Sequence, residues 1–125
     1  MILDTCAVLW LARGSKEISA VIRSRIEAAP AVYVSAISGF EIVQKCRAGK
    51  LELPPAPADW FRAVIDHHDL SVVPLDMEVC LAAAGLPLVH RDPCDRFIIA
   101  TAKLNGWPVV TSDSRFKEYG IETLI

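Results

Sequence analysis

The chain has 125 residues, of which 53% are hydrophobic, and its formal net charge is −2 at pH 7. This length suits one domain that buries roughly two-thirds of its unfolded surface without disulfides, and the charge excludes a global basic field that attracts nucleic acid. The four cysteines Cys6, Cys46, Cys80 and Cys94 form no C-x-x-C pair, which predicts reduced thiols and a cytoplasmic protein. We expect neither a signal peptide nor a membrane span, because no suitable apolar run is present.

Short apolar segments alternate with helical patterns along the chain. Strands are expected at residues 1–3, 32–34, 70–74, 108–111 and 121–124. Helices are expected at residues 7–12, 20–29, 36–48 (capped by Ser35 or Ser38), 59–68, 77–84, 93–105 and 115–118, with a proline-rich loop at 54–57. This alternation, without an internal repeat, predicts one α/β domain over residues 1–125 with a parallel sheet.

The most informative segment runs from His90 to Ala102. Asp92 is suited to cap a helix that begins at Pro93, and the residues after Asp95 are mostly apolar, so this helix should be buried. Asp92 and Asp95 then stand one turn apart at the entrance of a buried helix. Either they only cap the helix and favour its dipole, or they join acids from other parts of the chain.

Three further acids are expected at the same edge of the sheet, because ligands of open parallel sheets bind beyond the carboxyl ends of the strands. Asp4 follows the first strand, Asp113 follows the fourth, and Glu41 lies early in the helix after the second. Each has an ordinary explanation as well. Asp4 and Asp113 can cap helices, and Glu41 can form an exposed ion pair with Lys45.

Five crowded carboxylates would repel one another without a cation, and Mg²⁺ or Mn²⁺ prefers oxygen ligands. Such a site suits hydrolysis of a phosphodiester by metal-activated water. The chain has no Gly-rich phosphate loop, no G-x-S-x-G turn and no H-E-x-x-H motif. A rival enzyme class, the aspartyl-phosphate phosphatases, would use Asp4 as nucleophile but needs a second aspartate where this chain has Cys6.

Several short motifs occur in a fixed order over nearly the whole chain. They are Ile2-Leu3-Asp4-Thr5, Tyr33-Val34-Ser35, Phe40-Glu41-Ile42, Gly49-Lys50-Leu51-Glu52-Leu53-Pro54, Leu86-Pro87, His90-Arg91-Asp92-Pro93, Asp95-Arg96, and Val110-Thr111-Ser112-Asp113 with Phe116. In this order they resemble the PIN-domain family, and closely the VapC-type ribonuclease toxins of prokaryotic type II toxin–antitoxin modules.

The resemblance implies a three-layer PIN-like α/β fold, with a five-stranded parallel sheet and helices on both faces. It implies a Mg²⁺- or Mn²⁺-dependent endoribonuclease that uses metal-activated water and no protein nucleophile. The implied catalytic acids are Asp4, Glu41, Asp95 and Asp113. The implied metal ligands are Asp4, Asp95 and Asp113, with Asp92 as a further ligand or only a cap, and the implied supporting side chains are Ser35, Thr111 and Ser112.

Three positions depart from the family pattern without removing an acid. Cys6 stands where histidine is common, Gly39 where a bulky residue is common, and Cys94 where phenylalanine is common. A glycine inside a helix costs about 1 kcal/mol, so we expect Gly39 to loosen the helix that carries Glu41.

Basic residues near the acids in sequence could hold RNA phosphates or could simply be solvated surface charge. They are Lys45, Arg91, Arg96, Arg115 and Lys117. His90 is expected to be a packing or surface residue rather than a metal ligand.

The resemblance also implies an RNA substrate, a homodimer, and a cognate antitoxin that inserts a segment near the acidic site. The apolar stripes at residues 21–26 and 60–65 are candidate partner surfaces, although core packing is the more frequent use of such stripes. The competing hypothesis is a catalytically inactive PIN fold that binds RNA or antitoxin, which a failure to bind Mn²⁺ would favour.

Overall fold

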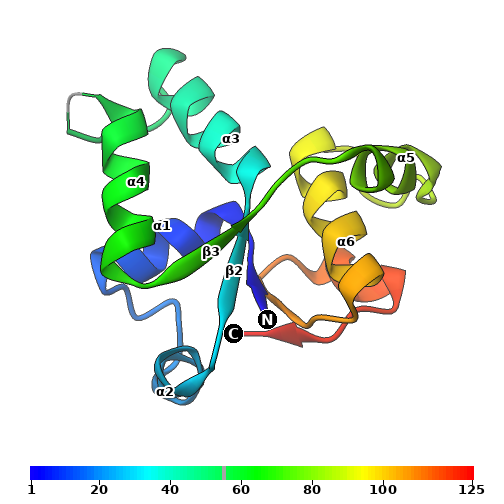
Figure 1. Ribbon diagram of the computed structural model, residues 1–125, viewed down its shortest axis with the longest axis horizontal. Helices are drawn as coiled ribbons and strands as arrows, with labels where there is room; N and C mark the ends of the chain where they lie inside the picture. Colours follow the sequence, from blue (N-terminus) through cyan, green and yellow to red (C-terminus); the bar gives the residue numbers. More distant parts are fainter. Residues whose placement is uncertain (55) are drawn as a thin grey trace.

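The computed structural model describes residues 1–54 and 56–125, and Figure 1 shows how they fold around one sheet. Within these residues the sheet has five parallel strands in the order β3-β2-β1-β4-β5. The strands are β1 (Ile2–Leu3), β2 (Val32–Ser35), β3 (Leu70–Val73), β4 (Val109–Val110) and β5 (Thr123–Leu124). The predicted parallel sheet is therefore confirmed. Pro55, which belongs to the expected proline-rich loop, lies outside the described residues.

Seven helical segments connect and follow the strands in the described part of the chain. They are α1 (Thr5–Arg13), α2 (Ala20–Ala28), α3 (Ala36–Arg47), α4 (Pro57–His67), α5 (Met77–Gly85), α6 (Pro93–Asn105) and the 3₁₀ helix η1 (Ser114–Tyr119). No helix among the described residues is both long and apolar enough to cross a membrane.

Side chains that accept backbone N–H groups set where these helices begin. Asp4 caps α1, which therefore starts two residues earlier than expected, and Asp92 caps α6 as predicted. Ser35, not Ser38, caps α3. At α4 no side-chain cap forms and Pro57 occupies the first turn, so the helix starts before the expected Asp59.

The sheet separates two apolar clusters, and the alternation of side chains along each strand assigns residues to them. Leu3 and Val110 pack with residues of α1, α2 and α4. Ile2 and Val109 point to the other face, where they pack with residues of α6 and η1. Figure 1 shows this arrangement, with α1, α2 and α4 on the left of the sheet and α5 and α6 on the right. The predicted layers of helix, sheet and helix are confirmed.

The order of the strands indicates which edge of the sheet is suited to bind a ligand. After β1 the chain moves outward in one direction to β2 and β3, and it later returns to the other side of β1 for β4 and β5. The order of the strands thus reverses between β1 and β4, and ligands of such sheets bind outside the carboxyl ends at this point. Asp4 follows β1 and Asp113 lies three residues beyond β4, so both acids lie at that crevice.

Candidate active site

Asp4 is fixed by the backbone turn from β1 into α1. One carboxylate oxygen accepts the Ala7 N–H at 2.8 Å, and the side chain is buried, with the residue only 6% exposed. Burial raises the pKa of Asp4, although hydrogen bonds from the Thr111 side chain and the Ala7 N–H partly offset that effect. Asp4 is therefore both the helix cap that the sequence suggested and a buried charge facing the site.

Glu41 lies in α3 and is turned into the protein. Its Oε2 lies 3.4 Å from Lys45 Nζ, so the predicted i,i+4 pair forms. The alternative explanation, that Glu41 only forms an exposed ion pair, does not hold, because Glu41 is 9% exposed. The reason is tertiary, because Ile37 and Ile42 of the same helix enter the two apolar clusters and turn Glu41 toward the acids.

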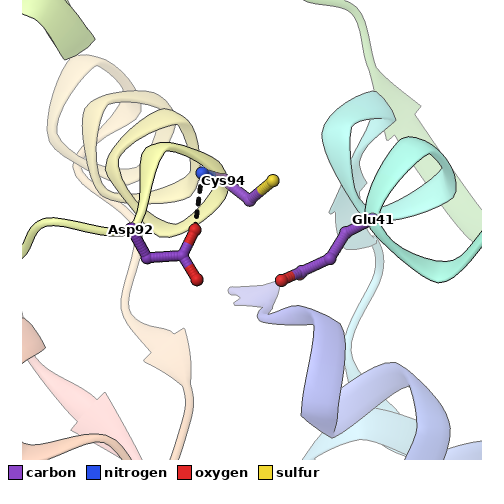
Figure 2. Close-up of side chains that lie close together, drawn as sticks. All are labelled: Glu41, Asp92 and Cys94. Carbon is purple, nitrogen blue, oxygen red and sulfur yellow. Dashed lines mark hydrogen bonds between the residues drawn. The ribbon is translucent and has the colours of Figure 1, made fainter. Parts of the chain in front are cut away.

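Figure 2 shows Glu41 of α3 pointing across to Asp92 and Cys94 at the start of α6. One ligand atom from each of these three side chains lies within 4.8 Å of the others. Asp92 also accepts the Cys94 N–H at 2.9 Å, so the capping prediction is confirmed. Capping uses one carboxylate oxygen, and the two roles considered for Asp92 do not exclude each other.

Asp95 stands where all the other acids converge. Its pKa is raised to about 7, first by burial and then by the negative charges of Asp92, Glu41, Asp4 and Asp113. Acids from four separate segments of the chain thus meet around one carboxylate. A carboxyl group whose pKa is raised in this way would be stabilised in its ionised form by a nearby positive charge.

Asp113 has the opposite electrostatic environment. Its pKa is lowered to about 2, chiefly by a hydrogen bond from the Arg115 side chain. Arg115 Nε lies 3.0 Å from Asp113 Oδ1, and an Nη atom lies 2.8 Å from Oδ2. This bidentate pair holds Asp113 ionised.

His90 is the site residue that sequence reasoning placed least well. The residue is 1% exposed, and its Nε2 lies 2.9 Å from Oδ2 of both Asp95 and Asp113. It is therefore buried, as a packing residue would be, but it contacts the acids directly. Its place in the motif His90-Arg91-Asp92-Pro93 was the available signal.

Arg96 is committed to the backbone. Its two terminal nitrogens donate four hydrogen bonds of 2.8–3.1 Å to the carbonyl oxygens of Ala83, Leu86, Pro87 and His90. The guanidinium therefore fastens the segment between α5 and α6. This use of all four terminal N–H donors gives Arg96 a structural role that its sequence position did not suggest.

The remaining predicted residues fall in different environments. Thr111 is buried beside Asp4, and its Oγ1 accepts the Asp113 N–H at 3.0 Å, whereas Ser112 is exposed. Ser35 is buried and accepts the Ile37 N–H, so its hydroxyl serves the start of α3. Arg91 is exposed and Lys45 is partly buried.

Asp95 and Asp113 form, with His90, a group whose possible metal-ligand atoms lie within 4.8 Å of one another. Carboxylate oxygens from Asp4, Asp95 and Asp113 are the ligands that Mg²⁺ and Mn²⁺ prefer. The nearby Cys94 thiol adds no negative charge at neutral pH, because burial and the surrounding acids raise its pKa to about 11. The sulfur therefore leaves the oxygen character of the site unchanged.

Comparison with known proteins gives three concordant findings. The family model for the PIN domain matches residues 1–122. Ribonuclease VapC22 from Mycobacterium tuberculosis (strain ATCC 25618 / H37Rv) is 29% identical over 120 residues, which cover 95% of this chain and 91% of that protein.

Two solved structures have the same fold. DNA-bound VapBC from Salmonella typhimurium matches with a TM-score of 0.66 and 20% identity, over 98% of this chain and 94% of that chain. FitAcB from Neisseria gonorrhoeae matches with a TM-score of 0.63 and 20% identity, over 99% of this chain and 96% of that chain.

Proposed function

Because this chain belongs to the PIN domain family, we propose that it is a Mg²⁺- or Mn²⁺-dependent endoribonuclease, a hydrolase acting on phosphodiester bonds, and the toxin of a type II toxin–antitoxin module. The observation that carries the proposal is the gathering of Asp4, Glu41, Asp92 and Asp113 around Asp95, whose pKa is raised to about 7 first by burial and then by these charges. The relative named Ribonuclease VapC22 supports RNA as the substrate. The cytoplasm is the expected compartment, because all four cysteines are free thiols.

Each acid has a separate task in this proposal. Asp4, Asp95 and Asp113 would hold the cation, with Asp92 as a further ligand. A bound divalent cation supplies polarisation of the scissile phosphate and activation of a water. The water would form the new bond to phosphorus while the bond to the leaving sugar oxygen breaks, and that oxygen would take up a proton from solvent. Glu41, buried beside Lys45, would be an additional carboxylate that accepts a proton from that water.

Positive charge for RNA phosphates would come from the rim of the site. Arg91 is exposed, and the Lys45 and Arg115 side chains are 40% and 54% exposed, so all three can reach a ligand. Arg115 is already close to the cation ligand Asp113. Arg96 contributes indirectly, because its guanidinium is used to hold the segment that carries His90.

The two stripes that the sequence suggested pack largely in the core, so we propose another surface for the partner. Ile22, Ile26, Phe61 and Val64 are buried in the core. A groove of about 470 Å³ between α3 and α4 instead exposes apolar side chains between two arginines. Its lining includes Gly39, Phe40, Val43, Phe61, Arg47 and Arg62. This groove supports an antitoxin segment with apolar and acidic residues as a partner.

A second apolar surface supports the proposed homodimer. Met77 and Leu81 follow each other by one turn on α5 and are 68% and 62% exposed, and Leu88 in the next segment is 81% exposed. Exposed apolar side chains on one face of a helix, such as Met77 and Leu81, favour association between copies of a chain. Light scattering of the purified protein and of Leu81→Glu tests this surface, because the charged variant should become monomeric.

Cleavage of a structured RNA by the antitoxin-free protein tests the nuclease directly. We expect cleavage with Mg²⁺ or Mn²⁺, none with EDTA, and a loss of at least about 100-fold in Asp95→Asn, since metal-ion stabilisation of the transition state is worth several kcal/mol. Asp59→Asn is a matched control, because Asp59 forms an exposed ion pair with Arg62 in α4. An active Asp95→Asn protein would contradict the proposed role of Asp95.

The same preparation distinguishes the competing hypotheses. Absence of both cleavage and Mn²⁺ binding would favour an inactive PIN fold that binds RNA or antitoxin. Isolation of a phosphorylated Asp4 would instead favour the aspartyl-phosphate phosphatases.

A further inference from the structure

We propose that the side chains of Thr5 and Ser38 form a positioning pair, whose hydrogen bond fixes where Glu41 stands relative to Asp4. The inference rests on the proposed function, because it takes Glu41 as the carboxylate that accepts a proton from the attacking water. It assigns a task to two buried hydroxyl groups that neither the set of acids nor the helix caps explain.

The Thr5 and Ser38 hydroxyl groups meet inside the protein. Their oxygen atoms lie 2.9 Å apart, and either hydroxyl can be the donor. Thr5 is 2% exposed and Ser38 is 0% exposed. A buried hydroxyl that loses its partner is left without a hydrogen bond, which is unfavourable in an apolar environment. Movement of one side chain away from the other is therefore opposed.

The hydrogen bond joins the two helices whose starts carry Asp4 and Glu41. Thr5 is the first residue of α1 and directly follows Asp4. Ser38 lies in α3 three residues before Glu41, and residues at this spacing are neighbours on one face of a helix. Ser38 has no part in starting α3, because Ser35 caps that helix. Its hydroxyl is thus available to hold the Glu41 face of α3 against α1.

Apolar packing alone is less exact at this point. Ile37 and Ile42 anchor α3 in the two apolar clusters, but the hydrophobic effect has no direction. A hydrogen bond is limited in both length and angle. Packing therefore brings α3 to its place, and the hydroxyl pair sets its final position. A displacement of a catalytic group by about 1 Å can lower a rate about 100-fold.

Two substitutions of Thr5 separate the hydroxyl from the packing of the side chain. Thr5→Val keeps the shape of threonine and removes the hydroxyl, whereas Thr5→Ser keeps the hydroxyl and removes a methyl group. Thr101→Val is the matched control. Thr101 is also 0% exposed, but its hydroxyl donates to the Phe97 carbonyl at 2.8 Å within α6.

Cleavage of a structured RNA with Mn²⁺ is the first readout. We expect Thr5→Val to lower kcat about 10–100-fold with KM within about threefold of wild type. Thr5→Ser and Thr101→Val should keep kcat within about threefold. In a Glu41→Gln background, Thr5→Val should cause no further loss. Equal kcat in Thr5→Val and wild type, or the same loss with and without the Glu41 carboxylate, would overturn the proposal.

Mn²⁺ affinity, measured by calorimetric titration without RNA, is the second readout. Asp4 keeps its own hydrogen bond from the Ala7 N–H, so Thr5→Val should bind Mn²⁺ within about threefold of wild type. A merely structural defect would weaken Mn²⁺ binding and cleavage together. That parallel loss would mean that the pair supports the whole site rather than Glu41, and it would overturn the proposal.

Ser38→Ala removes the same hydrogen bond from α3 and covers the case in which Thr5→Val does not fold. It should lower kcat as Thr5→Val does, and the double variant should lose no more than either single variant, because only one bond is removed. Independent, multiplying losses would overturn the pair. Full activity of Glu41→Gln, or no cleavage by wild type, would instead contradict the proposed function, and this inference with it.

Discussion

The acidic site has two walls that hold carboxylates by different means. The first wall, Asp4 and Glu41, belongs to the β1–α1 turn and to α3, and both residues are at most 9% exposed. The second wall, Asp95 and Asp113, is held by side chains, with His90 contacting both acids and Arg115 pairing with Asp113. Backbone and apolar packing therefore place one wall, whereas a polar network places the other.

The difference shows that similar side chains in one site are not equivalent. Within the second wall alone, burial and like charge raise the pKa of Asp95 to about 7, and the Arg115 hydrogen bond lowers that of Asp113 to about 2. Asp113 carries a counter-charge already, and Asp95 lacks one. A cation bound between the two walls would relieve Asp95 most, and this expectation can be tested.

The largest expected effect is stabilisation by Mn²⁺, which residues of both walls would hold. At a concentration about 100 times its Kd, a ligand that binds only the folded state stabilises it by about 2.7 kcal/mol. For a domain of this size, that corresponds to a rise in Tm of about 10 °C. Thermal unfolding across a Mn²⁺ titration measures it. Asp95→Asn should respond far less, and an unchanged Tm in wild type would contradict a metal centre that joins the walls.

The second prediction concerns how the raised pKa of Asp95 changes the stability of the metal-free protein with pH. The unfolded state loses the Asp95 proton near the ordinary value of 3.8, while the folded state keeps it up to about pH 7. The folded state therefore binds more protons across this range, and its stability falls as pH rises. Asparagine does not titrate, so Asp95→Asn removes this dependence of stability on pH.

The expected result is that Asp95→Asn becomes more stable relative to wild type as pH rises from about 4 to 8 in EDTA. Urea unfolding at several pH values measures the difference. If the difference in free energy of unfolding between the two proteins stayed constant with pH, the pKa of Asp95 would be the same in the folded and unfolded states. The same substitution should remove cleavage, so the charge would be retained for function at the expense of stability.

The smallest expected effect concerns the apolar packing behind the first wall. Gly39 of α3 was expected to loosen the helix, but a Cβ built there would lie 2.9 Å from Cε1 of Phe61 in α4. Overpacking costs about 1–3 kcal/mol, which exceeds the gain of about 1 kcal/mol from replacing a helical glycine. Gly39→Ala should therefore lower the free energy of unfolding by about 1 kcal/mol.

Gly85→Ala is the matched control, because no atom lies within 4 Å of a Cβ built at the end of α5. Its free energy of unfolding should stay the same or rise slightly. Urea unfolding of both variants decides the matter. Stabilisation by Gly39→Ala would mean that the close approach of α3 to α4 adjusts freely and that the first wall is not fixed by packing.

The sequence by itself determined the features that depend on neighbouring residues. Alternating apolar segments predicted the parallel α/β sheet, and the expected helix starts at residues 20, 77 and 93 are those of α2, α5 and α6. The positions of four acids along the chain predicted that they lie at one edge of the sheet, because each comes after a strand or in the first half of a helix on that side. These acids are Asp4, Glu41, Asp95 and Asp113. Their catalytic roles remain a prediction.

Only the tertiary structure decided how the acids are held, because those contacts join residues far apart in the chain. Glu41 is buried through packing on two apolar clusters, which its local i,i+4 pair with Lys45 cannot reveal. Arg96 binds four carbonyl oxygens that come together only when α5 meets α6. His90 reaches Asp113 across 23 positions of sequence. The local sequence pattern predicts where charged residues lie along the chain, and long-range packing determines which residues they contact.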